Sequence, residues 1–463
     1  MTSAAVPPPH LDAALEHEGQ RVPVRVTTRG RLSLAVTFLG PATTFAAGTV
    51  FSRLVFERDG KEMALSRARL TEAPRPGAAG VLVFVDDVYD CAALVDEGQV
   101  RNLLAFFGEL PLVLAQREQI STEFRAFVAD LNYDLTVYKK FFDQQDRVFE
   151  QEPPTVAHAA QHALLARAGD EFFGYLDRML DRLAELVQGF TPEQHERHGY
   201  YFRQQLWPFI MGSAFMQRTN LKPRGYAGDA QMMDMIYDDA FQGRWVFNKL
   251  MHKHPIAHPG AQAVRNRRVL VPQMLHAARV GRPTPLRVLS VACGPARELA
   301  DLFKAPRDCA ELSITLLDQD DEALQTALST VKGLETRLGT RIEARVVNQS
   351  VRTLLKEADL AARLGRFHFI YTMGLFDYLT PPVARAVLER LYALLEPGGL
   401  ILVGNYHVSN RSRYYMAYWL DWALYYRTED EMLEMARRLP GASATVSFDD
   451  SRCQMFLRVE KPS

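Results

Sequence analysis

From about residue 281 onward, the chain alternates short apolar segments typical of strands with longer segments of helical pattern. The strand candidates are residues 286–292, 312–317, 342–347, 367–372 and 400–403. Strands that alternate with helices run parallel in one sheet, and the helices then cover both of its faces. The pattern therefore predicts an α/β domain with a doubly wound sheet, which we assign to residues 221–463.

The N-terminal part of the chain has a different texture. Residues 22–27, 32–39, 49–56 and 81–85 are strand candidates, and Asp59-Gly60 is a strong hairpin signal between two β-type segments. Residues 1–20 are rich in Pro and Ala, which predicts a flexible tail. We therefore expect a small all-β, barrel-like module over residues 21–115.

Between these parts, apolar side chains recur at helical spacing. Phe124, Val128, Leu131 and Leu135 are three or four residues apart, as on one face of a helix. Thr191-Pro192-Glu193 is typical of a helix start, with an N-cap followed by proline at the first position. Residues 116–220 are therefore predicted to form a helical connector or lid.

Composition excludes several classes of protein. A hydrophobic content of 48% argues against a disordered chain, and a net charge of -1 lacks the usual signature of a nucleic-acid-binding protein. The four cysteines are widely spread and predict neither a disulfide framework nor a metal site. No secretory signal is visible, and no apolar run reaches the roughly 20 residues that span a bilayer. We therefore expect a cytoplasmic protein without stable membrane insertion.

The most informative stretch is Ser290-Val291-Ala292-Cys293-Gly294-Pro295-Ala296, in which a buried strand ends in a tight turn of small residues before a helix. Such a turn lets backbone N–H groups approach a ligand closely. The next strand ends in Asp318, about 20 residues after Gly294, which is the spacing of a ribose-binding carboxylate. Asp318 is therefore a candidate for hydrogen bonds to two ribose hydroxyls.

Three further segments complete an ordered set: Asn348-Gln349-Ser350 after the third strand, Thr372-Met373-Gly374 after the fourth, and Glu396-Pro397-Gly398-Gly399 before the fifth. The set resembles the class I S-adenosylmethionine-dependent methyltransferases, over about half of the chain, and implies their Rossmann-like fold. A nicotinamide dehydrogenase is the competing interpretation, but the G-x-G-x-x-G pattern is not present in the turn.

The resemblance implies S-adenosyl-L-methionine as cofactor and S-adenosyl-L-homocysteine as product. Ala292, Cys293 and Gly294 would line its methionine part, and Glu298 would replace the acidic residue that the family carries where this chain has Ser290. The full set of expected cofactor-binding residues is Tyr226, Ala292, Cys293, Gly294, Glu298, Asp318, Gln319, Asn348, Gln349, Ser350, Thr372, Met373 and Gly374.

Three segments, residues 222–237, 374–379 and 404–427, resemble a narrower bacterial group of methyltransferases that make 3-hydroxy fatty acid methyl esters. The resemblance implies a small acceptor with an apolar body, a fatty or hydroxy fatty acid. The loop at residues 222–229 suits a lid. Aromatic side chains suggest an apolar acceptor pocket, although helical packing also explains their spacing. Its expected residues are Phe376, Tyr378, Tyr415, Trp419 and Arg427.

A carboxylate acceptor is already ionised at pH 7, so its methylation needs alignment rather than a general base. We expect Tyr226, Tyr406 and His407 to position it, with His407 as a base if the acceptor is a hydroxyl or an amine. The alternatives are another small apolar metabolite as acceptor, or a non-catalytic protein that senses the cofactor or another ligand.

Two basic patterns remain. Arg265-Asn266-Arg267-Arg268 favours a solvated helix face, with capture of a carboxylate or phosphate as the alternative. Arg21-Val22-Pro23-Val24-Arg25 gives the β module a weak resemblance to PilZ-type barrels, which bind cyclic di-GMP. Because the second PilZ motif, Asp-x-Ser-x-x-Gly, is not found, an interaction or homodimerisation module is favoured.

Overall fold

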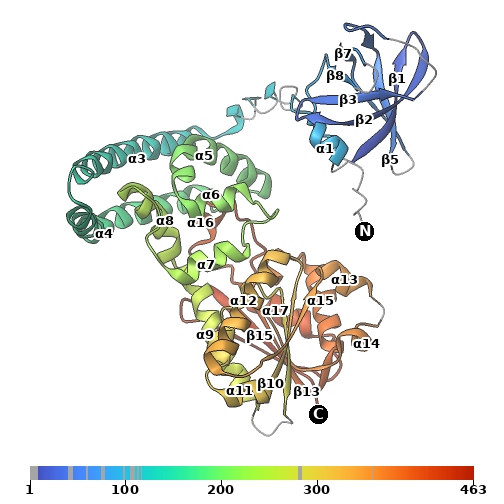
Figure 1. Cartoon of the computed structure of the whole chain (residues 1–463). Helices are drawn as coiled ribbons and strands as arrows, with labels where there is room; N and C mark the ends of the chain where they lie inside the picture. Colours follow the sequence, from blue (N-terminus) through green and yellow to red (C-terminus); the bar gives the residue numbers. More distant parts are fainter. Residues whose placement is uncertain are drawn as a thin grey trace. The chain divides into compact units, whose positions relative to one another are not determined.

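A computed structural model of the chain describes residues 9–39, 45–58, 61–74, 79–96, 100–104, 110–111, 114–115, 117–279, 284–357 and 359–463. The predicted turn at Asp59-Gly60 lies outside the described residues. The chain divides into two compact units, Met1–Gln119 and Ile120–Ser463. Figure 1 draws both units.

The first unit is an eight-stranded antiparallel sheet, with the strands in the order β4-β7-β8-β3-β2-β1-β5-β6. Only Ser52 separates β4, at one end of this order, from β5, which is next to the other end, so the sheet curls and brings its two edges toward each other. The strands are β1 (His10–His17), β2 (Gln20–Gly30), β3 (Ser33–Phe38), β4 (Val50–Phe51), β5 (Arg53–Arg58), β6 (Lys61–Leu65), β7 (Ala68–Glu72) and β8 (Gly80–Phe84), followed by α1 (Cys91–Asp96).

Strand β1 lies in the segment for which the composition predicts a flexible tail. Its residues pair along their whole length with β2, from His10 opposite Thr27 to His17 opposite Gln20. Leu15 is fully buried in the core of this unit, and Leu11 and Ala13 pack against the same core, so alternate apolar side chains hold the strand where Pro and Ala content alone suggests a tail.

The two arginines of the PilZ-like pattern lie on β2 and are already paired with acids. Arg21 contacts Glu62 at 2.7 Å and Glu16 at 3.3 Å, and Arg25 contacts Asp12 at 2.7 Å. About half of each arginine side chain is exposed, so these pairs contribute little to stability.

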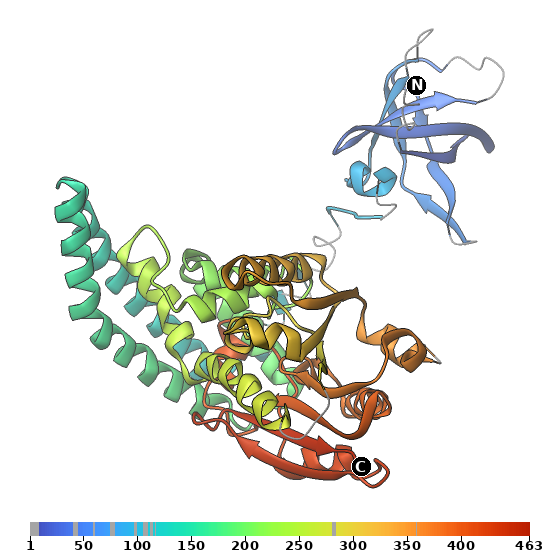
Figure 2. The same ribbon diagram turned by 60° about the horizontal axis from the view of Figure 1, so that its bottom comes forward.

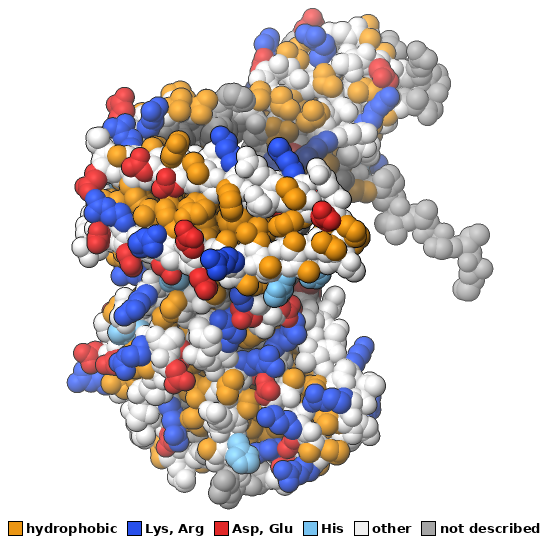
Figure 3. Space-filling view, turned by 90° about the vertical axis from the view of Figure 1, so that its left-hand side faces the viewer, with side chains coloured by type: hydrophobic (Ala, Val, Ile, Leu, Met, Phe, Trp, Pro, Cys, Tyr) orange, Lys and Arg blue, Asp and Glu red, His pale blue; other side chains and the backbone are white. Residues whose placement is uncertain are grey.

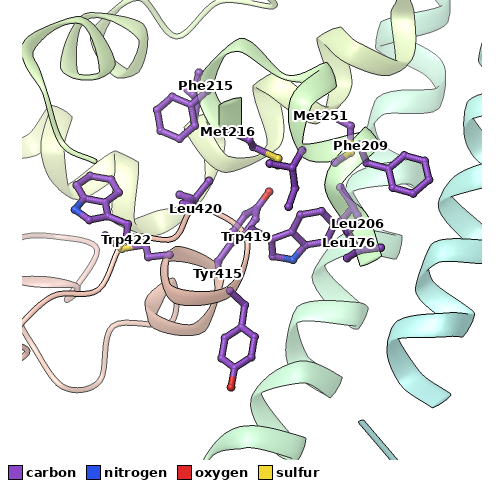
Figure 4. Packing of buried hydrophobic residues seen from close by; sticks show 14 of the residues in the cluster. Leu176, Leu206, Phe209, Phe215, Met216, Met251, Tyr415, Trp419, Leu420 and Trp422 are labelled. Carbon is purple, nitrogen blue, oxygen red and sulfur yellow. The ribbon is translucent and has the colours of Figure 1, made fainter. Parts of the chain in front are cut away.

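The second unit begins with helices. After the 3₁₀ turn η1 (Arg117–Gln119), they are α3 (Thr122–Phe149), α4 (Pro154–Val187), α5 (Pro192–Gly212), α6 (Ala214–Leu221), α7 (Ala230–Asp238), α8 (Val246–Ala257) and α9 (Pro259–Arg279). Thr191 caps α5 as expected, in a capping box with Gln194. Their apolar faces share one core with the short helix α16 (Arg413–Tyr418), and Figure 4 shows part of this core.

The predicted α/β fold is confirmed. A seven-stranded sheet has the order β11-β10-β9-β12-β13-β15-β14, in which β9 to β13 run parallel and β15 runs antiparallel to β13. Figure 2 shows the two last strands at one edge of this sheet, near the C-terminus. The strands are β9 (Leu286–Val291), β10 (Leu312–Asp318), β11 (Glu343–Asn348), β12 (Phe367–Thr372), β13 (Leu395–Tyr406), β14 (Ser443–Phe448) and β15 (Gln454–Glu460).

Helices cover both faces of this sheet. Successive β9 residues alternate between two cores: Leu286 and Val288 pack with the core that includes α9, and Leu289 and Val291 pack on the opposite side. The remaining elements are α10 (Leu299–Leu302), α11 (Pro306–Glu311), α12 (Asp321–Leu338), α13 (Val351–Lys356), α14 (Leu360–Leu364), η2 (Phe376–Tyr378), α15 (Pro381–Ala393) and α17 (Glu429–Ala436).

The helical part of the second unit has apolar side chains on its surface. In Figure 3 they form a band flanked by charged side chains, and α3 exposes Tyr133, Val137 and Phe141, which lie at four-residue spacing on one face. Among the described residues, no helix combines the length and the hydropathy needed to cross a membrane.

Candidate functional site

A cavity of about 390 Å³ lies at the carboxyl ends of the parallel strands. Its volume falls within the range of roughly 300–1,000 Å³ found for small-molecule sites. Ligands of open α/β sheets bind at this edge, because the strand order reverses there and leaves a crevice. The α6–α7 loop and helices α7 and α9 contribute the wall that faces this edge.

The turn after β9 forms one side of the cavity. Ala292, Gly294 and Ala296 have φ values of 52°, 55° and 49°, a left-handed conformation that costs energy for residues other than glycine. The Gly294 N–H donates a 2.9 Å hydrogen bond to Asp318 Oδ2, and the Asp320 N–H donates a 3.0 Å bond to Oδ1. Burial raises the pKa of Asp318, and these N–H bonds oppose that rise.

A second buried carboxylate lies at the start of α10. Glu298 is 8% exposed, and its Oε1 accepts a 2.7 Å hydrogen bond from the Tyr371 hydroxyl on β12. Burial raises the pKa of Glu298 and outweighs the opposing effect of this hydrogen bond. Tyr371 in turn has a side-chain hydrogen bond with Ser290. Ser290, near the end of β9, is therefore connected through Tyr371 to Glu298.

The α6–α7 loop closes the cavity from the helical side. Asp229 anchors it by an ion pair with Arg218 at 2.7 Å, and Arg224 forms an ion pair with Glu322 on α12. Tyr226 lines the cavity, where burial and the nearby carboxylate of Asp318 raise its pKa. The loop therefore covers the edge of the site at which Asp318 lies.

An aromatic pair forms the neighbouring wall. The Trp422 indole N–H donates a 2.7 Å hydrogen bond to the Tyr378 hydroxyl, and both side chains line the cavity together with Gly228. A Cβ at Gly228 would overlap the Tyr378 hydroxyl and lie 3.0 Å from Trp422 Cζ2. Gly228 therefore allows the loop to approach these two rings closely.

Charged groups lie at the β12 and β13 side of the cavity. Asp377 Oδ1 accepts a 2.7 Å hydrogen bond from the backbone N–H of Tyr406, and burial raises the Asp377 pKa to about 6. The Tyr406 hydroxyl donates a 2.7 Å bond to the Gly260 carbonyl. Arg267 of α9 also lines the cavity and is 8% exposed, so this residue of the basic cluster is not on a solvated face.

Twelve of the residues expected from the sequence line this cavity together: Tyr226, Ala292, Cys293, Gly294, Glu298, Asp318, Gln319, Gln349, Met373, Gly374, Tyr378 and Tyr406. They come from the α6–α7 loop and from segments that follow five successive strands. The sheet topology therefore brings together residues up to 180 positions apart, since Tyr226 and Tyr406 face one cavity.

The other expected cofactor residues lie outside the cavity. Asn348 is exposed and bonds to Asp321, and Ser350 is the N-cap residue of α13. Thr372 is fully buried at the end of β12. Of the segment after the third strand, only Gln349 faces the cavity.

The remaining expected acceptor residues have structural contacts. The Tyr415 hydroxyl lies 2.7 Å from His254 Nδ1, and Trp419 packs among the helices near Leu206, as Figure 4 shows. Phe376 is buried on the α15 side of the sheet. α16 ends at Tyr418, so Trp419 and Trp422 do not share a helix face, and only Trp422 lines the cavity.

Arg427 and His407 also lie outside the cavity. Arg427 is buried and donates a 2.8 Å hydrogen bond to the Phe376 carbonyl. The His407 ring lies 2.7 Å from Ser409 Oγ and packs edge-on against Phe448. His407 therefore has no described contact with the cavity in which it is predicted to position the acceptor.

The expected cofactor and acceptor residues do not include several polar residues that line the cavity, among them Arg267, Tyr371 and Asp377. Arg267 belongs to the basic cluster for which capture of a carboxylate or phosphate is the alternative interpretation, and the other two lie within or beside segments whose neighbouring residues carry the prediction. No group of three or more His, Cys, Asp or Glu side chains in the described part of the chain is arranged to hold a metal ion.

No known protein family matches the chain, and no curated protein matches it in sequence. Among solved structures, it is similar to a "possible exported protein" from Bordetella parapertussis, with 17% identity, coverage of 64% of this chain and 98% of that one, and a TM-score of 0.43. It is also similar to magnesium protoporphyrin IX methyltransferase from Synechocystis with bound S-adenosylhomocysteine, with 12% identity, 50% and 95% coverage, and a TM-score of 0.36.

The N-methyltransferase NodS from Bradyrhizobium japonicum, in complex with S-adenosylhomocysteine, is a further match, with 12% identity, 42% and 87% coverage, and a TM-score of 0.30. The similarity to these methyltransferase structures is distant, and it covers between 42% and 50% of the chain.

Proposed function

We propose that the protein is an S-adenosylmethionine-dependent O-methyltransferase that converts the carboxylate of a fatty or hydroxy fatty acid into a methyl ester. The observation that carries the proposal is the single cavity in which the Ala292-Cys293-Gly294 turn, Asp318 and Glu298 meet an aromatic wall. When bound there, the cofactor would supply an electrophilic methyl group on a sulfonium sulfur.

The cofactor side of the cavity supports the proposal by its chemistry. Space beside Gly294 is open, since a Cβ there would meet nothing within 4 Å, so a ligand can approach the backbone. Asp318 offers carboxylate oxygens at the strand end where a ribose would lie. Glu298 is a buried acid suited to an ammonium group, because its ionised form gains from a positive partner in a site of low dielectric.

The acceptor side supports an amphipathic substrate. Tyr378 and Trp422 present aromatic surface, and their two polar atoms already satisfy each other. A second, smaller cavity of about 20 Å³ shares Tyr406 and Trp422 with the main one and is otherwise lined mainly by apolar side chains, including Phe215, Met416 and Leu420. The smaller cavity has room for about one water-sized molecule, so the apolar surface offered to an acceptor is the wall that Tyr378 and Trp422 form in the main cavity.

The test is transfer of a labelled methyl group from S-adenosylmethionine to a panel of long-chain acids, 3-hydroxy acids, alcohols, amines and unrelated metabolites. The proposal expects a labelled product only with the acids, and alkaline hydrolysis of that product should release labelled methanol. Label on alcohols or amines in place of acids would contradict the carboxylate acceptor. Cofactor binding without transfer to any acceptor would favour a sensing role.

A hydroxyl acceptor on another apolar metabolite is the second candidate, and one observation favours it. Asp377 faces the cavity with a pKa of about 6, so it is ionised at neutral pH and close to the range suited to a general base. A fatty alcohol in the panel decides between the two, because only this candidate predicts its methylation. His407, which lies outside the cavity, is replaced by Asp377 as the base in this scheme.

We further propose that the N-terminal barrel is an interaction or dimerisation module. Its PilZ-like arginines are engaged by Glu62, Glu16 and Asp12, which leaves their charges partly neutralised. Light scattering of the full chain tests homodimerisation, for which a mass near twice 52.3 kDa is expected. A monomeric mass at all accessible concentrations would contradict a homodimer.

A further inference from the structure

Arg267 carries a buried charge beside the cavity and forms no direct ion pair with the described residues, although the buried carboxylates of Asp377 and Glu298 interact with it electrostatically. Its Nη1 donates a 2.8 Å hydrogen bond to the Met373 carbonyl, its Nη2 lies 3.1 Å from Met233 Sδ, and Tyr237 is a further partner. Among the described residues, no carboxylate oxygen lies within 4.0 Å of its guanidinium nitrogens. A thioether is a weak acceptor, so this guanidinium retains unused donor capacity.

Two other arginines show what a structural role looks like in this domain. Arg427 is also buried, but it lies away from the cavity and donates to the carbonyls of Phe376 and Leu379 and to the Asn405 side chain. Arg268 lines the same cavity, but its charge is neutralised by Asp301 at 2.8 Å. Because the interactions of Arg267 with Asp377 and Glu298 are not direct ion pairs, its buried guanidinium can still donate a charge-assisted hydrogen bond to an anion in the cavity.

The position of Arg267 separates it from the ribose end of the site. In the sheet, β9 lies between β10, which ends at Asp318, and β12, which precedes Met373. A Cβ at Gly374 would lie 3.5 Å from both Nη atoms of Arg267, so the guanidinium covers the loop after β12. Asp318 and Arg267 therefore lie on opposite sides of the turn after β9. An anion bound to Arg267 is accordingly separated from the part of the cavity where Asp318 would bind the ribose.

We propose that Arg267 binds the carboxylate of the acceptor in a charge-assisted hydrogen-bonded pair; this inference rests on the proposed function. The pair would hold one carboxylate oxygen toward the methyl carbon. In the transfer, the new O–CH₃ bond forms as the C–S bond of the sulfonium breaks, and that bond's electron pair remains on sulfur as a neutral thioether. The acceptor changes from an anion to a neutral ester, and no proton moves.

This assignment gives the site a means of releasing its product. The acid is held by an ion pair with Arg267, and the ester has lost the charge on which that pair depends. Acid and ester of the same chain length should therefore differ in affinity, although their apolar parts are identical. Arg267 would accordingly discriminate for anionic acceptors and against alcohols, amines and esters.

The experiment compares Arg267→Met and Arg267→Lys with the matched control Arg265→Lys on the same helix, since Arg265 contacts the carbonyls of Ile236 and Ile256 and does not line the cavity. Three quantities are measured: the Kd of S-adenosylmethionine, the KM of a long-chain acid, and calorimetric binding of a long-chain alkyl sulfonate, an anion that reports binding without turnover.

For Arg267→Met we expect the acid KM and the sulfonate Kd to rise about 100-fold or more, as when one partner of a buried charge pair is lost. In Arg267→Lys, the acid KM and the sulfonate Kd should lie within about tenfold of the wild-type values, because lysine keeps the positive charge but lacks the planar guanidinium. The Kd of S-adenosylmethionine should stay within about threefold of the wild-type value in the Arg267 variants. In the control Arg265→Lys, all three quantities should stay within about threefold of their wild-type values.

Unchanged KM and sulfonate affinity in Arg267→Met would overturn the assignment, as would a loss of cofactor affinity, which would place the guanidinium on the methionine part of the cofactor. A lower Tm with equal weakening of every ligand would mean a structural role and would also overturn it. If the wild type binds no S-adenosylmethionine, the proposed function itself fails. Sulfonate binding that still depends on Arg267 would then support the anion site by itself.

Discussion

The backbone N–H of Gly294 donates a hydrogen bond of 2.9 Å to the carboxylate of Asp318, 24 residues further along the chain. This bond joins the turn after β9 to the end of the neighbouring parallel strand β10. It orients one carboxylate oxygen toward the turn, while the Asp320 N–H orients the other. The two sequence motifs on which the cofactor assignment depends are therefore one structural unit.

Asp318→Asn should weaken S-adenosylmethionine binding about 10- to 100-fold, since the substitution removes a charged acceptor and presents an amide NH₂ to donors already in place. Calorimetric titration measures this. Glu343→Gln on the exposed part of β11 is the control and should bind like the wild type. An Asp318→Asn variant with unchanged cofactor affinity would contradict the ribose-binding role.

Cofactor affinity should fall on acidification through the pKa of Glu298. Burial raises this pKa above its ordinary value, so the carboxylate becomes protonated at a higher pH than an exposed glutamate does. A protonated Glu298 no longer attracts the cofactor's ammonium group. In Glu298→Gln, the affinity for the cofactor should be lower at neutral pH and should depend less on pH. The pH dependence that remains is expected to come from Asp318. A variant whose binding follows the same pH curve as the wild type would exclude this contact.

Asp377 should make the ligand-free protein less stable as pH rises. Its pKa is raised from 3.8 to about 6, so the folded state holds the proton more tightly than the unfolded state. This contribution is fully present below about pH 4 and is lost as pH rises through about 6, a difference of about 3 kcal/mol in unfolding free energy. Denaturant unfolding of Asp377→Asn across this pH range should show a smaller loss of unfolding free energy than the wild type shows. Identical slopes for variant and wild type would rule out the shifted pKa.

Gly228→Ala should disturb the aromatic wall, because the added methyl group overlaps the Tyr378 hydroxyl and presses on Trp422. Overpacking of this kind costs about 1–3 kcal/mol, and the KM of the acid should rise more than the Kd of the cofactor. Thermal unfolding and steady-state kinetics measure the two effects. Gly333→Ala, where a Cβ meets open space on α12, is the control and should be neutral or stabilising by up to about 1 kcal/mol. Equal behaviour of the two variants would show that the loop does not pack on this pair.

The turn after β9 and its connection to β10 are predictable from the sequence because the signals for both are local. A buried strand, a turn of small residues and an acid at the end of the next strand are each visible within a few positions, and parallel pairing then brings Gly294 to Asp318. The same holds for Thr191, whose capping box depends only on the three residues that follow it. These features need no knowledge of the rest of the fold.

The acceptor side is less predictable because it depends on tertiary packing. Arg267 and Arg268 are adjacent and equally basic, yet of the two only Arg268 forms a direct ion pair with a described acidic residue. Trp419 and Trp422 have helical spacing, but α16 ends before both of them. Trp419 packs in the core of the helices, and Trp422 lines the cavity. Strands β14 and β15 add an edge to the sheet beyond the alternating pattern from which the other five strands are predicted.

The most direct test of the account is equilibrium dialysis of the full chain against labelled S-adenosylmethionine. The account predicts one equivalent bound per chain, with a Kd between about 1 μM and 1 mM, the usual range for enzyme substrates, and competition by S-adenosylhomocysteine. Retention of label no greater than with an unrelated protein of similar size would contradict the assignment of the cavity and, with it, the proposed methyl transfer.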